Sequence, residues 1–353
     1  MMRSYLDYNA TTPLRAEARV AMGAAMDVVG NPSSVHQEGR AAKSLIEKAR
    51  AQVAAAIGAD GADVIFVSSA TEGAALALAG GDIHCSEVEH DAVASWCKTD
   101  LQVDRNGIVA VDRPKKSAQQ LANSETGVIQ TLPEDLFLCD ATQGFGKIPV
   151  AFNWTGASHM LISAHKIGGP KGIGALIVKE GTDIPAQIKG GGQEMGRRSG
   201  TENTIGIAGF GAAAAAAAAD LASGRWDEIE VFRNILENTL AESVKGTILV
   251  GNDAQRLPNT MCISLPGWKG ETQVMQMDLS GFAISAGSAC SSGKVKESRV
   301  LKAMGYSPEV AKSAIRVSLG LETTRAEIDA FIAAWVKKAN IYKARKGTTG
   351  ATL

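Results

Sequence analysis

Apolar residues along this chain follow two periods, one typical of helices and the other of buried strands. Residues 40–57 place apolar side chains at helical spacing, and Gly58 ends that pattern. Residues 63–67 form the kind of short apolar run that a buried strand shows, and a turn of small residues at 68–73 leads into an Ala/Leu-rich helix. Because a helix N-terminus presents free N–H groups, this turn predicts an anion site.

Further short strands and helices alternate after that turn. Strands are expected at 136–139, 159–163 and 173–178. Strands that alternate with helices predict a mostly parallel sheet that is covered on both faces and binds ligands at the carboxyl ends of its strands. The alanine run at 212–219 predicts a tightly packed helix, because alanine favours helix and lets neighbours approach closely.

The last part of the chain begins with a charged helix at 225–243, which is predicted to link two domains. Short strands near 260–265 and 282–285, a Gly/Ser loop at 287–293 and two helices are expected after it. The tail from Lys343 is basic and then rich in Gly and Thr, so it is expected to be disordered.

Composition narrows the classes of protein that this chain can belong to. Its 353 residues carry 36 Lys and Arg against 37 Asp and Glu, so it lacks the basic excess of an obligate nucleic-acid-binding protein. Five cysteines without a Cys-x-x-Cys pair argue against a disulfide framework or a zinc finger and favour a reducing, cytosolic setting. Asp7 interrupts any signal peptide, and the longest uncharged apolar stretch, 205–219, is too short and too weakly apolar to span a bilayer.

Three reactive side chains follow strands or lie in a loop of small residues. Lys166 ends an apolar strand before a Gly-rich turn, a position that can lower the pKa of an amine for Schiff-base chemistry; the alternative is a solvated loop lysine. Asp140 follows another strand and is either the partner of a pyridinium nitrogen or a helix N-cap. Cys290, close in sequence to two lysines, is either a reactive thiol or a small buried side chain.

Two further groups have both a functional and a structural interpretation. Arg316 alternates with apolar residues on a strand-like run, so it pairs either with a structural anion or with a substrate carboxylate. The polar residues from His84 to His90 match no standard metal-ligand spacing, and alternation on a strand that ends at His90 explains them more simply. The chain also lacks a Walker A motif and a Gly-x-Gly-x-x-Gly after a strand, the main signs of nucleotide sites.

An ordered set of motifs along nearly the whole chain resembles the cysteine desulfurases, pyridoxal-phosphate enzymes of the class V aminotransferase group. Each motif alone is weak, whereas the set in this order is specific. The motifs lie at residues 5–12, 30–34, 70–72, 89–90, 125–127, 140–143, 163–166, 168–172, 197–203, 287–290 and 315–316.

This resemblance implies a role for individual residues. Lys166 would bond covalently to the cofactor, Asp140 would pair with its pyridinium nitrogen, and the Cys290 thiolate would take sulfur from the substrate. His90 would stack on the cofactor ring and take part in catalysis. Further cofactor contacts are implied for Ala70, Thr71, Ser124, Gln143, Ser163, His165 and, across a subunit interface, Thr201. Substrate contacts are implied for Asn31 and Arg316.

The resemblance also implies the fold and the reaction. The fold would be α/β, of fold type I, with a large sheet domain at 14–235 and a smaller α+β domain formed by 1–13 and 236–353. With pyridoxal 5'-phosphate, the enzyme would convert L-cysteine to L-alanine and leave a persulfide on Cys290. A homodimer in the cytoplasm would pass the sulfur to acceptor proteins such as an iron–sulfur scaffold, with no metal, nucleic acid or membrane required.

The chain departs from the family pattern in three places, one of which is residues 73–75, where Gly-Ala-Ala replaces the polar residues usual after the 70–72 motif. Ser124 stands where members usually have a second asparagine, which affects one cofactor contact, and the region 100–140 is shortened. Two alternatives stay open, and the departures motivate the second. One is a selenocysteine lyase or another class V enzyme, and the other is a weakly active paralogue that acts as a partner protein.

Overall fold

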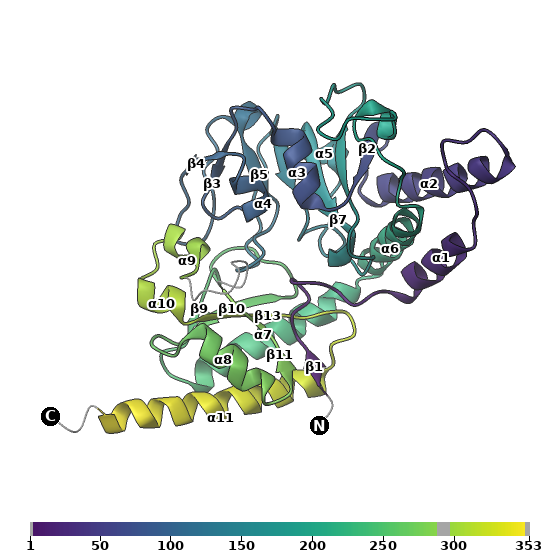
Figure 1. The fold of residues 1–353 in the computed structure, drawn as a ribbon. Helices are drawn as coiled ribbons and strands as arrows, with labels where there is room; N and C mark the ends of the chain where they lie inside the picture. The colour runs from purple at the N-terminus through teal and green to yellow at the C-terminus, as the bar shows by residue number, and fades with distance from the viewer. Residues whose placement is uncertain (1–2, 288–296, 350–353) are drawn as a thin grey trace.

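The structure, a computed structural model, describes residues 3–287 and 297–349. Figure 1 shows an upper part and a lower part, each built on its own sheet, with both ends of the chain at the lower part. The predicted reactive thiol, Cys290, lies outside the described residues.

The upper part contains a five-stranded sheet within the described residues, in the order β2-β8-β7-β6-β5. Its strands are β2 (Ala62–Val67), β5 (Ala118–Gln120), β6 (Leu138–Asp140), β7 (His159–Ser163) and β8 (Gly174–Lys179). β5, β6 and β7 pair in parallel, and β8 runs antiparallel to both its neighbours, so β2 points the same way as the other three. The predicted mostly parallel sheet is confirmed, with β8 as its exception.

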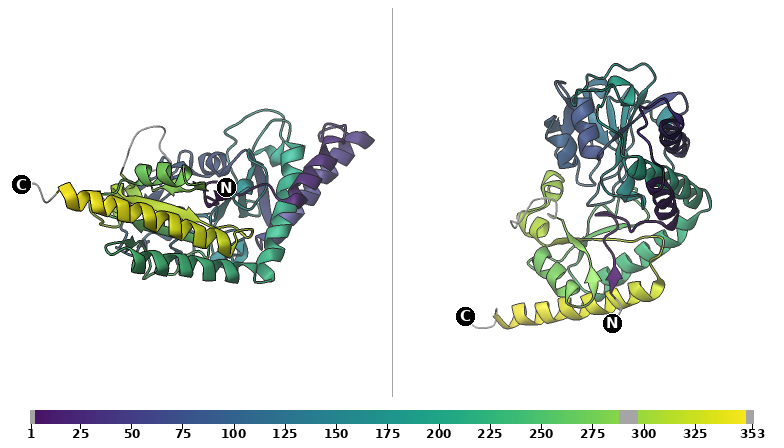
Figure 2. Two further views of the ribbon diagram at one scale, coloured as in Figure 1. Left: turned by 90° about the horizontal axis from the view of Figure 1, so that it is seen from below. Right: turned by 45° about the vertical axis from the view of Figure 1, so that its right-hand side comes forward.

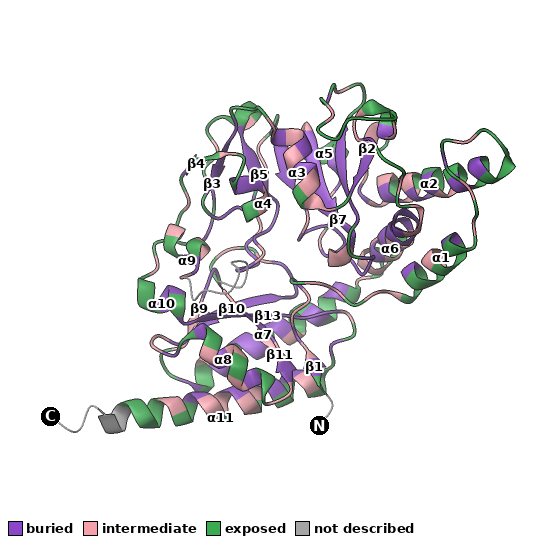
Figure 3. Ribbon diagram, in the orientation of Figure 1, coloured by how far each residue is buried: buried purple, intermediate pink, exposed green. Residues whose placement is uncertain are grey.

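Helices cover both faces of this sheet, because successive side chains of a strand point to opposite sides. Phe66 and Ile162 belong to the core under α2 and α6, whereas Ile65 and Leu161 belong to the core under α3. The elements around the sheet are α1 (Ala16–Met26), α2 (Gln37–Ala56), α3 (Ala70–Leu78), β3 (His84–Ser86), α4 (Asp91–Ala94), β4 (Lys98–Leu101), α5 (Phe152–Thr155) and α6 (Thr204–Ala222). Figure 3 shows the buried strands between these partly exposed helices.

The alanine run packs as predicted, in α6 against α2. A Cβ added to Gly211 would lie 2.6 Å from the Cα of Ala49, so the two helices are in close contact. In the described part of the chain, α6 is also the one helix that is long and apolar enough to cross a membrane by length and composition. The uncharged stretch 205–219 within it is by itself too short to span a bilayer, which is why the sequence predicted otherwise. Half of its most apolar window is buried, and the helix packs against α1 and α2 as a core helix does.

The lower part contains a four-stranded sheet in the order β12-β13-β10-β9 and the strand pair β1-β11. Its strands are β1 (Ser4–Tyr5), β9 (Ile248–Leu249), β10 (Thr260–Ser264), β11 (Phe282–Ala283), β12 (Ser285–Ala286) and β13 (Ala314–Ser318). The helices α7 (Arg225–Ser243), α8 (Gly270–Asp278) and α11 (Arg325–Thr349) share a second core with it. Figure 2 shows α7 and α11 side by side.

The division between the two predicted domains falls inside α7. The buried side chains Trp226, Leu236 and Leu240 of this helix belong to the lower core, and so does Leu6 from the N-terminal segment. The packing of Leu6 is in line with grouping residues 1–13 with the C-terminal part. The boundaries themselves stay a prediction.

The C-terminal region contains more helix than the sequence suggested. Instead of two helices, the described residues there form α9 (Arg299–Ala303), α10 (Pro308–Lys312) and α11. The expected disorder from Lys343 is wrong as far as the end of α11. Phe331, Trp335 and Ala339 recur at helical spacing and are buried in the lower core. Their packing stabilises α11, and the basic residues after Lys343 form the last turns of this helix.

Candidate active site

A cavity of about 380 Å³ lies where the carboxyl ends of the parallel strands meet the lower part. Its wall includes the polar ends of β6 and β7, the start of α3, and β12 and β13 of the lower part. It brings together most of the predicted site residues: Ala70, Thr71, His90, Ser124, Asp140, Gln143, Ser163, His165, Lys166 and Arg316. The structure therefore brings these predicted residues together at one cavity, and their individual roles stay a prediction.

One end of the cavity is suited to an anion. Ser69 caps α3 by accepting a hydrogen bond from Glu72 N, and the first turn of this helix, with Ala70 and Thr71, lines the wall. β8 approaches closely, since a Cβ on Gly174 would lie 3.1 Å from the Ala70 nitrogen. Free N–H groups and the helix dipole make such an N-terminus a site for phosphate.

A buried carboxylate, that of Asp140, lies in another part of the wall, at the end of β6. Asp140 is buried, and its Oδ1 accepts a hydrogen bond from Thr142 N at 2.9 Å. Beside it, Glu89 is fully buried and accepts from Gln120 N at 2.7 Å. Burial, and after it the nearby Asp140, raise the pKa of Glu89 well above its usual value, which favours the neutral form of this side chain.

Lys166 follows β7 in a short turn of 3-10 helix, as its place after a strand predicted. Its Nζ donates to the carbonyl oxygens of Asn9, at 2.6 Å, and Ala10, at 3.0 Å. The neighbouring His165 contacts the Thr11 hydroxyl at 3.2 Å through Nδ1. Burial, followed by the charge of nearby lysines, lowers the pKa of His165 to about 4, so its imidazole is neutral near pH 7.

Arg316 combines the two interpretations that the sequence left open. Its Nη2 pairs with Asp7 Oδ1 at 2.8 Å and its Nη1 donates to the Ser124 carbonyl at 2.9 Å, so it has structural partners. It also lines the cavity, and its buried Nε has no hydrogen-bond partner among the described residues. A guanidinium at a cavity wall suits an anionic group of a ligand.

His90 lies in the cavity wall at the start of α4, where its Nδ1 accepts a hydrogen bond from Ala92 N at 3.1 Å. The strand before it ends at Ser86, so the expected strand running to His90 is wrong. The chain turns after Ser86 because the Ser86 hydroxyl and carbonyl accept from the next backbone N–H groups. Within the described ranges, no cluster of three His, Cys, Asp or Glu side chains is placed to hold a metal ion.

Two of the predicted residues that the structure describes, Asn31 and Thr201, do not line this cavity. Asn31 is exposed in the loop between α1 and α2, where its side chain accepts from Ser33 N. Thr201 is exposed just before α6, which is compatible with its expected role across a subunit interface. Cys290 lies outside the described residues, and its place at the cavity stays a prediction.

The cavity also contains residues that sequence reasoning missed. Asn9 and Gln120 line it, and Lys147 lies buried behind it. Gln120 ends β5, a short polar strand that apolar periodicity cannot detect. Asn9 lay within a quoted motif but carried no predicted role, and Lys147 gave no signal beyond its place four residues after Gln143, one helical turn along the chain.

Comparisons with known proteins agree with this geometry. Residues 4–331 match the family model described as aminotransferase class-V. The chain belongs to this family. It is 38% identical over 361 residues to "Cysteine desulfurase IscS" of Dictyoglomus turgidum, covering 92% of this chain and 91% of the relative.

Solved structures place the chain in the same group. The NifS-like protein from Rickettsia africae superimposes with a TM-score of 0.86 at 34% identity, covering 95% of this chain and 99% of the other. The structure titled "SspA in complex with cysteine" gives a TM-score of 0.76 at 26% identity, covering 91% and 100%. Within the class V family the chain is therefore a cysteine desulfurase of the NifS-like fold, which confirms the predicted fold class.

Proposed function

We propose that this cysteine desulfurase uses pyridoxal 5'-phosphate to take sulfur from L-cysteine and leaves it as a persulfide on Cys290. The observation that carries the proposal is the single cavity that joins Lys166, Asp140 and a helix N-terminus with Arg316. Class V aminotransferases are pyridoxal-phosphate enzymes, and this set of groups matches the aldehyde, the pyridinium nitrogen and the phosphate of that cofactor. Alanine would be the second product.

The residues present fit the cofactor. The start of α3 with Ala70 and Thr71, together with Ser163 and His165, would hold the phosphate. The Lys166 amine would form the covalent bond, and the other cofactor contacts would come from His90, Ser124, Asp140 and Gln143. When bound, the cofactor supplies an electron sink for the carbon that carries the substrate amine.

The chain's own residues would bind the substrate and move its protons. Arg316 would hold the carboxylate of cysteine, since its guanidinium lines the cavity. The Lys166 amine, released when the substrate amine takes its place, would carry a proton between substrate atoms. Neutral His165 would contact the phosphate without adding a second positive charge.

Sulfur transfer would then fall to Cys290. Its thiolate would form an S–S bond to the sulfur of cysteine as the carbon–sulfur bond breaks, and a proton would return to the carbon to give alanine. Gly287, the last described residue before the segment with Cys290, follows β12 in the cavity region, where Ser285 lines the wall. From Cys290, the sulfur would pass to acceptor proteins such as an iron–sulfur scaffold.

A second copy of the chain is proposed to complete the site through Thr201. Figure 1 shows α1 and α2 projecting from the upper part, and the apolar side chains in and after α1 are exposed. They are Val20, Met26, Val29 and Val35. Exposed apolar side chains gathered in one region mark protein contacts. Light scattering should show a dimer for the wild type and for Val231→Asp, a matched exposed valine, and a monomer for Val35→Asp.

The decisive experiment is the release of alanine and sulfide from L-cysteine in the presence of a reductant. The wild type and Cys97→Ala, a partly buried thiol outside the cavity, should make both in equal amounts, whereas Cys290→Ala should make neither. Activity in Cys290→Ala equal to that of the wild type would contradict the role of Cys290. Release from L-selenocysteine alone would favour the lyase, and a protein that makes no product from either would favour the partner-protein alternative. The cytoplasmic location stays a prediction.

A further inference from the structure

A second lysine, Lys147, lies directly behind the cavity and has no role in the mechanism above. It is 3% exposed, and its Nζ donates to Gln143 Oε1 at 2.9 Å and to Asn9 Oδ1 at 3.3 Å. Both of these hydrogen-bond acceptors are neutral amide oxygens, and no ion pair with a carboxylate is formed by Lys147 within the described residues. A buried amine with only neutral partners costs free energy, which calls for a compensating role.

Both acceptors of Lys147 in turn hold groups that line the cavity. Gln143 Nε2 donates to the Asn9 carbonyl at 3.0 Å, and the same carbonyl receives Lys166 Nζ at 2.6 Å. Lys147 thus fixes which end of the Gln143 amide points to Asn9, because only the oxygen end can accept from an amine. The two lysines are connected through one asparagine.

Asn9 links this group to the lower part of the molecule. Its Nδ2 donates to Thr260 Oγ1 at 2.8 Å and to the Ser124 carbonyl at 3.2 Å, and its Oδ1 also accepts from Asn259 at 3.1 Å. Its backbone N–H donates to Ser318 Oγ at 2.9 Å. Each polar atom of this residue therefore has a partner, and its carbonyl is held in one place relative to both sheets.

We propose that Lys147 is a positioning residue of the active site, whose buried amine, held between Gln143 and Asn9, orients the Gln143 amide and the carbonyl that receives Lys166. The inference rests on the proposed function, because it concerns the cofactor and lysine chemistry of the same cavity.

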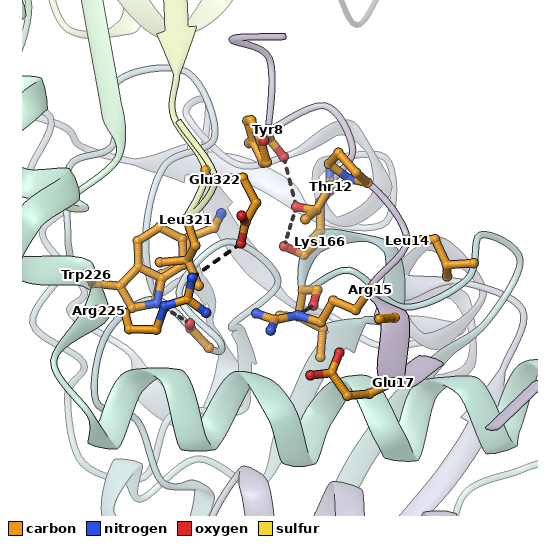
Figure 4. A pocket seen from close by; sticks show the side chains of 16 residues that line it. Tyr8, Thr12, Leu14, Arg15, Glu17, Lys166, Arg225, Trp226, Leu321 and Glu322 are labelled. Carbon is orange, nitrogen blue, oxygen red and sulfur yellow. Dashed lines mark hydrogen bonds and ion pairs between the residues drawn. The ribbon is translucent and has the colours of Figure 1, made fainter. Parts of the chain in front are cut away.

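The surroundings of Lys147 permit this role near neutral pH. The charged groups that face it are Lys166 and Arg316, both cations, and burial together with these charges lowers the pKa of Lys147 to about 7. In either protonation state the amine keeps two protons to donate, so the two hydrogen bonds do not depend on its charge. Lys147 also borders a second cavity of about 370 Å³ on the other side of Lys166, which Figure 4 shows with Thr12 bridging the backbone of Tyr8 and Lys166.

The test compares Lys147→Met, which keeps the length of the side chain but removes the donor, with Lys48→Met on the exposed face of α2. Crystal structures of the two cofactor-free proteins should show the Gln143 amide displaced from Asn9 only in Lys147→Met. In the loaded proteins, visible circular dichroism of the bound cofactor should change only in Lys147→Met. Its kcat should fall by about tenfold or more while KM changes little, because misplacement of reacting groups lowers kcat.

An unchanged Gln143 in the crystal of Lys147→Met would overturn the proposal, whatever the activity. The proposal would also be overturned if the circular dichroism of the bound cofactor is unchanged and kcat stays within about twofold of that of Lys48→Met. Such a result would mean that the Lys147 amine does not position the reacting groups. A wild type that binds the cofactor but releases no alanine would contradict the proposed function instead. In that case the crystal comparison still decides the role of Lys147.

Discussion

Replacing Lys147 by methionine is expected to stabilise the fold near and below pH 7, and this gain is expected to disappear as the pH rises. The pKa of Lys147 is lowered from 10.5 to about 7 in the folded chain, first because the amine is buried and then because Lys166 and Arg316 lie near. Between these two values the unfolded chain binds one proton more than the folded chain. Stability therefore rises with pH across this window, and below about pH 7 the folded chain carries the full cost of a buried charge.

The size of the effect follows from the difference between the two pKa values. One pKa unit corresponds to ~1.4 kcal/mol, so the full cost is ~5 kcal/mol, of which ~3 kcal/mol is relieved between about pH 7 and pH 9.5. Lys147→Met removes this dependence but leaves the two amide oxygens with one donor fewer, which costs ~1 to 3 kcal/mol at every pH. The stability of the variant minus that of the wild type should thus fall by about 3 kcal/mol over this range.

Urea unfolding of the cofactor-free proteins, followed by far-ultraviolet circular dichroism from about pH 6.5 to pH 9.5, measures this difference. Lys48→Met serves as the control, because its amine is exposed and its unfolding should follow that of the wild type at each pH. Parallel curves for the wild type and Lys147→Met would refute the reasoning, since they would mean that the buried amine has the same pKa in both states.

Three further outcomes follow from packing and charge. Gly23→Ala in α1, where an added Cβ meets nothing within 4 Å, should raise the free energy of unfolding by up to ~1 kcal/mol. Gly211→Ala in α6, where the added Cβ would lie 2.6 Å from a backbone carbon of α2, should lower it by ~1 to 3 kcal/mol. Thermal unfolding measures both changes, and a change in the same direction for the two variants would contradict this prediction. Arg256→Met should cost ~3 to 5 kcal/mol in urea unfolding, because it leaves buried Glu237, now bonded at 2.7 Å, without its cation; a loss no larger than that of an exposed pair would show that the pair is solvated. The His165 imidazole should titrate near pH 4 in nuclear magnetic resonance spectra, so the unfolded chain binds the extra proton between pH 6.5 and 4 and stability falls as the pH drops through that window; a midpoint near 6.5 would mean that the ring is solvated.

Local sequence patterns correctly predicted those helices and strands whose apolar residues recur with a clear helical or strand period. The strand His159–Ser163 and the helix Arg225–Ser243 have the predicted bounds, and most predicted site residues meet in one cavity because they follow parallel strands or begin a helix. β5 was missed because its polar glutamines break apolar alternation. The predicted C-terminal helix ended too early, because the composition after Lys343 resembles that of a disordered tail. The helix continues because Trp335 and its buried neighbours, which precede Lys343, pack it against the lower core.

The sequence by itself determined the family, the reaction class and the residues that bring reactive groups to the strand ends, because each of these depends on residue type and order along the chain. Only the tertiary structure decided that Asn9 contacts Gln143, Lys147 and Asn259, since these contacts connect segments more than a hundred residues apart. It also decided the pKa values of Lys147 and His165. The physical reason is that burial and neighbouring charge are properties of the packed chain, and no local pattern of residues contains them.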